Sequence, residues 1–181
     1  MSLFVAVRPD ETATDDLADV VDRARRSPAA AGLRWQPAAQ WHLTLAFLGE
    51  PADLDLAEVA SRLSALAERR AVTGVRIAGA GCFGRQILWM GLADDAAVAT
   101  LAGVAAAIPP LLRGSGLTVD RRPWRPHLTI ARARHGDARP VVPHLAGYRG
   151  PAWDASTLLL VHSTGGPHPQ HHVVHELPLQ R

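Results

Sequence analysis

One short pattern occurs twice in this chain of 181 residues, and it constrains the fold more than any other feature. Residues Trp41–Phe47 read WHLTLAF and residues Pro126–Arg132 read PHLTIAR, so both copies contain His-Leu-Thr, an aliphatic residue and Ala. Alternate side chains of a β-strand point to opposite faces, so the His and the Thr share one face while the Leu points to the other. We therefore predict two similar strands, each with a core-facing apolar side and an open side that carries one imidazole and one hydroxyl.

The polar pair in each copy, His42 with Thr44 and His127 with Thr129, has a cost that folding alone does not explain. Half-buried imidazole and hydroxyl groups lose hydration unless they find hydrogen bonds, whereas folding requires only the leucines. If the strands face each other, one imidazole can act as an acid and the other as a base, because histidine titrates near neutral pH. The repeat predicts a cleft for acid–base chemistry on a phosphate. The alternative is a duplication preserved for folding alone.

Around these copies the chain resembles the RNA 2',3'-cyclic phosphodiesterases, also called 2'-5' RNA ligases, of the two-histidine phosphoesterase superfamily. Trp41–Glu50 (WHLTLAFLGE) is similar to the first signature of that family, and Pro123–Ala133 (PWRPHLTIARA) is similar to the second. Weaker likenesses lie at Leu3–Val7, Phe83–Leu92 and Leu160–Ser163. The resemblance implies a LigT-like α+β fold with two pseudo-symmetric lobes of mainly antiparallel sheet, helices packed outside and a central active-site groove. It implies one bilobal phosphoesterase domain over residues 1–181.

The resemblance also implies an activity, which is metal-independent hydrolysis of RNA 2',3'-cyclic phosphate ends to 2'-phosphate ends. His42 would donate a proton to the departing 3'-oxygen, and His127 would accept a proton from water. The same groups could run the reaction backwards as 2'-5' RNA ligation. Two alternatives stay open: a two-histidine phosphoesterase acting on 2'-5' oligonucleotides or small cyclic nucleotides, and a non-catalytic RNA-binding module. The second is disfavoured because both His-Leu-Thr copies are intact.

Four further residues take roles from the same resemblance. Thr44, Thr129 and Arg132 would bind the phosphate, and Phe47 would stack on a nucleobase. Arg132 and Phe47 each lie five residues beyond a histidine, so an ideal strand would turn both side chains away from the open face. A twist or a bulge at each strand end would bring them back.

The charge distribution adds a second indication of an anionic partner. All 19 basic residues are arginine, and residues 113–134 hold six of them against one acid, Asp120. This stretch leads into the second copy of the repeat, so we predict a phosphate-attracting rim, with a solvated charged face as the alternative. The expected partners are RNA with 2',3'-cyclic phosphate ends or 2',3'-cyclic nucleotides, without a membrane or an obligate protein partner.

Cysteine and histidine usage suggests neither a metal nor a cofactor. Cys82 is the single cysteine, and the chain has no apolar run of membrane-spanning length and no signal peptide, so the cytoplasm is the expected location. A zinc site among the late histidines is disfavoured because no acid or cysteine completes a ligand pattern. Strand alternation would also place His172 and His175 on opposite faces. The late histidines are His162, His168, His171, His172 and His175.

Hydrophobic periodicity predicts the elements around the repeat. Strands are expected at residues 2–7, 40–48, 72–80, 86–92, 127–133, 157–162 and 172–179. Helices are expected at residues 10–26, from a capping Asp53 to about residue 70, and from Asp94 or Asp95 to Ile108, where Pro109 and Pro110 would end the helix. Residues 134–150 should form a proline-broken loop with a short helix, and Gly165–Pro167 a turn between the last strands.

Overall fold

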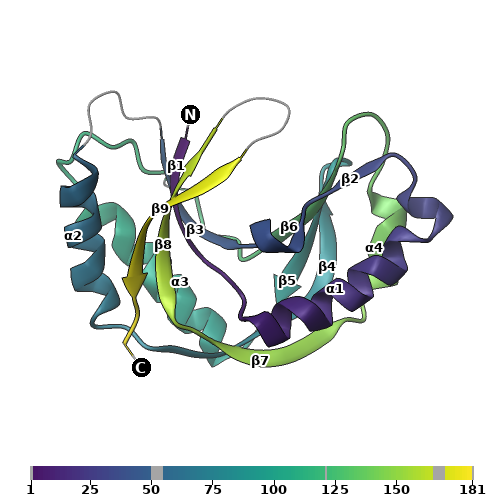
Figure 1. Cartoon of the computed structure of the whole chain (residues 1–181), viewed down its shortest axis with the longest axis horizontal. Coiled ribbons are helices and arrows are strands. Elements are labelled where there is room, and N and C mark those ends of the chain that lie inside the picture. The colour runs from purple at the N-terminus through teal and green to yellow at the C-terminus, as the bar shows by residue number, and fades with distance from the viewer. Residues whose placement is uncertain (1, 50–54, 121, 165–169, 181) are drawn as a thin grey trace.

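The computed structural model describes residues 2–49, 55–120, 122–164 and 170–180 (Figure 1). The strands are β1 (Ser2–Val7), β2 (Leu33–Trp35), β3 (Leu43–Gly49), β4 (Val72–Phe83), β5 (Ile87–Leu92), β6 (Leu128–Ala133), β7 (Arg149–Ala155), β8 (Thr157–Ser163) and β9 (His171–Pro178). The α-helices are α1 (Glu11–Arg25), α2 (Leu56–Ala67), α3 (Ala96–Leu111) and α4 (Val142–Leu145). Short 3-10 helices occupy Pro28–Ala30, Ala38–Gln40 and Arg139–Val141.

The described strands form a nine-stranded sheet in which every pairing is antiparallel. Its order is β7-β4-β5-β6-β3-β1-β8-β9, and the short β2 pairs with β6 beside this path. The two strands of the repeat, β3 and β6, are therefore central neighbours, with three strands on either side of them. This arrangement confirms the prediction of an α+β fold with two related halves of antiparallel sheet.

Helices cover the outer side of both halves (Figure 1). Helix α1 packs against β7 and α4, whereas α2 contacts β8, β9 and α3. Helix α3 packs against β3 and β4, one strand from each half of the sheet. Leu17 and Val21 of α1 and Leu63 of α2 are buried, as the helical periodicity predicts. None of the helices in the described part of the chain is long and apolar enough to cross a membrane.

Aspartates begin the three long helices. The side chain of Asp10 accepts a hydrogen bond from the backbone N–H of Ala13, and Asp95 caps α3 in the same way, as predicted. Asp55 caps α2. The predicted cap Asp53 lies outside the described residues, as does the predicted turn at Gly165–Pro167.

Three sequence predictions at element ends were wrong. Both repeat strands begin one residue after their histidine, because residues 38–40 form a 3-10 turn and because residues ahead of 128 are irregular. Helix α3 continues through Pro109 and Pro110 to Leu111. The two prolines have no backbone N–H to donate, but they lie in the last turn, so the rest of the helix keeps its hydrogen bonds. The loop predicted for residues 134–150 ends early, because strand β7 begins at Arg149 and continues to Ala155, through residues that were assigned to no element. Pro151 is tolerated there because β7 lies at an edge of the sheet.

Candidate active site

The two repeat histidines meet at the central strand pair. Leu43 and Leu128 lie directly opposite each other in the β3–β6 ladder, and both are fully buried. Continuing this antiparallel register by one residue places His42 opposite Thr129 and Thr44 opposite His127. All four polar side chains then share the face opposite the buried leucines, and each is only partly buried. The structure thus brings together the four residues that the repeat predicted.

The two imidazoles are oriented in the same way. Nδ1 of His42 lies 2.7 Å from the carbonyl oxygen of Gln40, and Nδ1 of His127 lies 2.7 Å from the carbonyl oxygen of Arg125. A carbonyl oxygen only accepts, so Nδ1 of each ring must carry the proton and donate it. Nε2 of each ring is left to accept or release a proton at a bound ligand.

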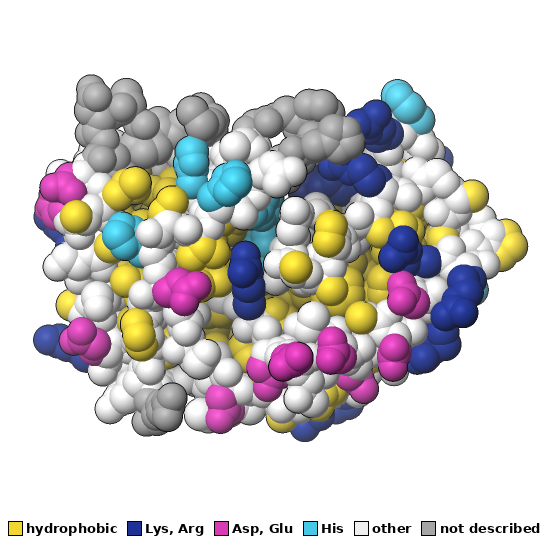
Figure 2. All heavy atoms as spheres, in the orientation of Figure 1, with side chains coloured by type: hydrophobic (Ala, Val, Ile, Leu, Met, Phe, Trp, Pro, Cys, Tyr) yellow, Lys and Arg dark blue, Asp and Glu magenta, His cyan; other side chains and the backbone are white. Residues whose placement is uncertain are grey.

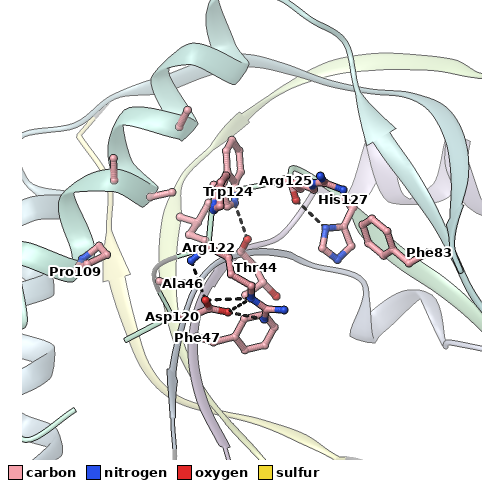
Figure 3. A pocket seen from close by; sticks show the side chains of 15 residues that line it. Thr44, Ala46, Phe47, Phe83, Pro109, Asp120, Arg122, Trp124, Arg125 and His127 are labelled. Carbon is pink, nitrogen blue, oxygen red and sulfur yellow. Dashed lines mark hydrogen bonds and ion pairs between the residues drawn. The ribbon is translucent and has the colours of Figure 1, made fainter. Parts of the chain in front are cut away.

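Each imidazole is also held by aromatic rings. The ring of Phe4 stacks on His42 at a centroid distance of 5.0 Å, and His171 meets the same imidazole edge-on at 5.0 Å. Phe83 contacts His127 edge-on at 4.8 Å (Figure 3). The packing leaves the rings little freedom to rotate, which fixes the direction of both Nε2 atoms.

Burial affects the protonation of His42 strongly. Desolvation of the ring lowers the pKa of His42 from 6.5 to about 4, although the hydrogen bond to the Gln40 carbonyl acts against it. The positive charges of His171, Arg8 and His127 lower this pKa further. His42 is therefore neutral at neutral pH as long as no anion occupies the site.

Matching bulges lie inside both repeat strands, at the third residue of each. On β3, Ala46 pairs with Val5 and Thr44 with Ala6, so Leu45 is an extra residue. On β6, Ala131 pairs with Leu88 and Thr129 with Trp89, so Ile130 is the extra residue. A one-residue bulge reverses the alternation beyond it. The residue five positions after each histidine is thereby returned to the open face.

The bulges bring Phe47 and Arg132 back to the side predicted by the family resemblance. Phe47 is 44% exposed and lies 6.0 Å from Phe4, measured between ring centroids. Arg132 is exposed, and its charge lowers the pKa of His171, which contacts His42. Desolvation of the guanidinium group by its neighbours and the charge of Arg34 lower the pKa of Arg132 itself, but a guanidinium group stays charged.

A pocket of about 760 Å³ adjoins the repeat on its His127 side (Figure 3). Thr44, Phe47 and His127 line it on one side, and small residues of α3 line it on the other. Nε1 of Trp124 donates to the carbonyl oxygen of Thr44 at 2.8 Å, which ties the loop before β6 to β3. Trp41, the residue before His42, is 3% exposed and belongs to the core.

Part of the arginine-rich stretch borders this pocket. Arg122 and Arg125 line it, but Arg122 forms a charge-assisted pair with Asp120 through several contacts of its guanidinium group. The backbone N–H of Asp120 donates to the carbonyl oxygen of Phe47 at 2.9 Å. Arg125 has an exposed side chain, and Arg121 lies outside the described residues. The stretch therefore contributes positive charge at the rim, partly offset by its one acid.

The late histidines divide into two groups. His171 belongs to the site, whereas His162 and His172 pair across β8 and β9. The prediction that His172 and His175 lie on opposite faces was wrong, because an irregularity in the β8–β9 register shifts the alternation between them. His168 lies outside the described residues. Within the described segments, no three histidine, cysteine or acidic side chains are grouped to hold a metal ion.

Sequence reasoning missed two charged or titratable neighbours of His42. Arg8 follows β1, and the pairing of Val7 with Leu43 continues to place it opposite His42. His171 begins β9 and reaches the same ring. Neither position carries a local signal, since both depend on which strands become neighbours.

Comparisons with known proteins agree with this geometry. The sequence model of the LigT like phosphoesterase family matches residues 7–89. An RNA 2',3'-cyclic phosphodiesterase of Thermus thermophilus is 31% identical over 83% of this chain and 77% of its own length. One from Geobacillus stearothermophilus is 36% identical over 58% of this chain, which spans only a third (33%) of that relative's length.

Solved structures show the same fold. The Thermus thermophilus protein TT0787 aligns over 99% of this chain and 98% of its own, with a TM-score of 0.77 and 24% identity. Escherichia coli LigT in its apo form aligns over the same shares, with a TM-score of 0.70 and 24% identity. With the Thermus relative covering most of both sequences, the chain belongs to the LigT-like phosphoesterase family.

Proposed function

We propose that this protein hydrolyses RNA 2',3'-cyclic phosphate ends to 2'-phosphate ends, with His42 and His127 as its acid–base pair. The observation that carries the proposal is the matched orientation of the two imidazoles on paired strands, each with Nδ1 donating to a backbone carbonyl. The curated relatives are named RNA 2',3'-cyclic phosphodiesterases, which supports the same reaction.

The chemistry follows from two groups on opposite sides of a strained cyclic diester. Nε2 of His127 accepts a proton from water while the water oxygen forms a bond to phosphorus. The bond from phosphorus to the 3'-oxygen breaks, and His42 gives its proton to that oxygen. The product has a 3'-hydroxyl and a 2'-phosphate. Reversal with a 5'-hydroxyl in place of water would form a 2'-5' linkage.

His42 can donate only after it has gained a proton. Its pKa of about 4 in the empty site means that it gains one together with the anionic substrate, because a nearby phosphate stabilises the imidazolium form. This coupling keeps the acid inactive until substrate is present. The assignment of donor and acceptor roles follows the family resemblance.

The phosphate oxygens need donors while charge develops on them. The hydroxyls of Thr44 and Thr129 have no hydrogen-bond partner among the described residues, so both are free to donate to these oxygens. Arg132 supplies a third contact, which is cationic, and the exposed ring of Phe47 offers a stacking face for a nucleobase. No metal ion and no cofactor has a role in this scheme.

Residues 1–181 are proposed to act as one bilobal domain, since one sheet and one large apolar core run through both halves. No obligate protein partner is part of the proposal. The cytoplasm is the proposed location, because the one cysteine, Cys82, is unpaired and suits a reducing compartment.

The direct test is incubation with a 2',3'-cyclic nucleotide in excess EDTA, with the position of the product phosphate read by phosphorus NMR. Formation of the 2'-phosphate without added metal is the expected result. Activity that disappears on chelation and returns with zinc or manganese would refute the metal-free scheme. A 3'-phosphate product would refute the assigned direction.

A further inference from the structure

Two buried nitrogen atoms beside His42 lack hydrogen-bond partners. Nε of Arg8 and Nδ1 of His171 are enclosed, and neither meets a partner within the described part of the chain. Buried polar groups in folded proteins are nearly always hydrogen-bonded, so a missing partner points to a water or a ligand. The proposed scheme of hydrolysis uses neither residue.

Both residues lie next to His42 but come from different strands. Val7 pairs with Leu43, so the next position along the ladder places Arg8 opposite His42. The ring of His171, at the start of β9, lies 5.0 Å from the ring of His42 and 5.4 Å from that of Phe4.

A small apolar floor adjoins the two groups. Phe4 and Ala6 form it with three residues of β8 and β9, as a cluster separate from the main core. Arg8 shares a face with both β1 residues by strand alternation. Figure 2 shows histidine and arginine side chains close together on this side of the molecule. An apolar floor strengthens the attraction between a cation and an anion, because it lowers the local dielectric.

Three acids lie near Arg8 without forming an ion pair with it in the described part of the chain. Asp10, Asp154 and Glu176 line a pocket of about 200 Å³ that Arg8 also lines. Asp10 caps α1, and Asp154 accepts from the backbone N–H of Gly74. No ion pair joins Arg8 to a carboxylate of the described residues. Its charge instead acts on the two histidines, lowering the pKa of His42 and of His171, whose burial is the larger cause.

The two halves of the site differ at this point. Met90 of β5 pairs with Leu128, so the next position along the ladder places Gly91 opposite His127. The equivalent position opposite His42 is Arg8. A glycine brings no charge. Of the two positions opposite the imidazoles, only the one facing His42 therefore carries a cation, and this is the side on which the proposed scheme places the departing ribose oxygen.

We propose that Arg8 and His171 form a second anion subsite beside His42, which binds the 5'-phosphate of the nucleotide that carries the cyclic end. The inference rests on the proposed function, because it takes an RNA end as the ligand. The scissile phosphate lies between the two imidazoles, and the next anion along the RNA is the phosphate on the 5' side of the same ribose. An end within an RNA chain, or a 5'-phosphorylated nucleotide, is then preferred to a nucleoside cyclic phosphate.

Binding of two product-like ligands tests the subsite without turnover. We expect adenosine 2',5'-bisphosphate to bind the wild-type protein about tenfold or more tightly than 2'-AMP by calorimetry, as for a charge-assisted hydrogen bond. Arg8→Met should bring this ratio close to one, and Arg8→Lys should restore part of it. His171→Phe, which keeps the ring and removes its nitrogens, should lower the ratio about threefold. Arg69→Met removes the same charge from an exposed site after α2 and should leave the ratio unchanged.

Three results would overturn the subsite: a wild-type ratio near one, an unchanged ratio in Arg8→Met, or an equal fall in Arg69→Met. Circular dichroism of each variant checks that it is folded. Hydrolysis of adenosine 2',3'-cyclic phosphate, measured in parallel, separates the two proposals. A ratio that depends on Arg8 in a protein without turnover would support the subsite and refute the proposed function.

Discussion

Acid should destabilise this protein through His42. Because burial lowers the pKa of His42 from 6.5 to about 4, the unfolded chain carries a proton at this position between those values and the folded chain does not. The free energy of unfolding is therefore highest above pH 6.5 and falls as the pH drops toward 4. At about 1.4 kcal/mol per pH unit, the loss reaches about 3 kcal/mol.

The change that removes this effect is His42→Asn, whose amide N–H can still donate to the carbonyl of Gln40. Urea unfolding followed by circular dichroism, from about pH 7.5 to about pH 4.5, gives the free energy of unfolding at each pH. Wild-type protein should lose about 2–3 kcal/mol more than the variant over this range. The exposed His135 offers the matched control, since His135→Asn should leave the wild-type pH dependence unchanged. The same slope in wild type and His42→Asn would refute the reasoning.

Other titrating groups do not blur this comparison. Burial and the charge of Arg8 lower the pKa of His171, so His171 acts in the same direction, but it is present in both proteins. The guanidinium group of Arg139 holds the pKa of Asp137 well below its ordinary 3.8, so stability from that pair is present above 3.8 and is lost only at lower pH. The difference between the two proteins above pH 4 thus reports His42.

Four further outcomes follow from the site. Calorimetry of 2'-AMP binding near pH 7 in buffers of different ionisation enthalpy should show uptake of a proton by His42, and the absence of uptake would contradict the coupling of donor and substrate. His42→Ala and His127→Ala should each lower kcat by at least about 10², and the double variant should be scarcely worse; near-wild-type turnover in either single variant would show a structural repeat. Thr44→Val and Thr129→Val should reduce kcat about tenfold, as expected for one lost donor to the phosphate, and unchanged kinetics would exclude that contact. Arg132→Ala should raise KM and lower kcat for every substrate, with partial rescue by Lys; unchanged kinetics would remove Arg132 from the site.

Much of the fold could be predicted because the strands of the repeat carry strong apolar patterns. Leu43 and Leu128 are fully buried partners, as their place in the two copies indicates. The long helices begin near acidic caps that the sequence displays, with Asp95 confirmed and Asp55 in place of the predicted residue. These features depend on local periodicity and capping, which a sequence shows directly.

The two strands that the sequence analysis did not predict, β7 and β2, show no local pattern of apolar residues. Strand β7, Arg149–Ala155, contains Gly150 and Pro151 and lacks regular alternation, and it forms because the edge of β4 accepts it. Strand β2, Leu33–Trp35, is three residues long and, among the described strands, pairs only with β6. Such strands are determined by the partner available in the folded sheet, so a window of sequence cannot identify them.

The paired bulges at Leu45 and Ile130 explain why alternation alone predicted the wrong face for Phe47 and Arg132. A strand in regular register would point both side chains into the core, where a guanidinium group would lose its hydration. The bulges occupy equivalent places in both copies, so the pseudo-symmetry extends to the backbone irregularity as well as to the residues. The symmetry then ends at the flanking strands, where Arg8 stands opposite His42 and a glycine opposite His127. A near-symmetric pair of imidazoles could not by itself distinguish donor from acceptor, whereas unlike neighbours give each ring a different charge environment. The sequence repeat therefore predicts the proposed pair of imidazoles, and the strands on either side of the repeat make the surroundings of the two rings different.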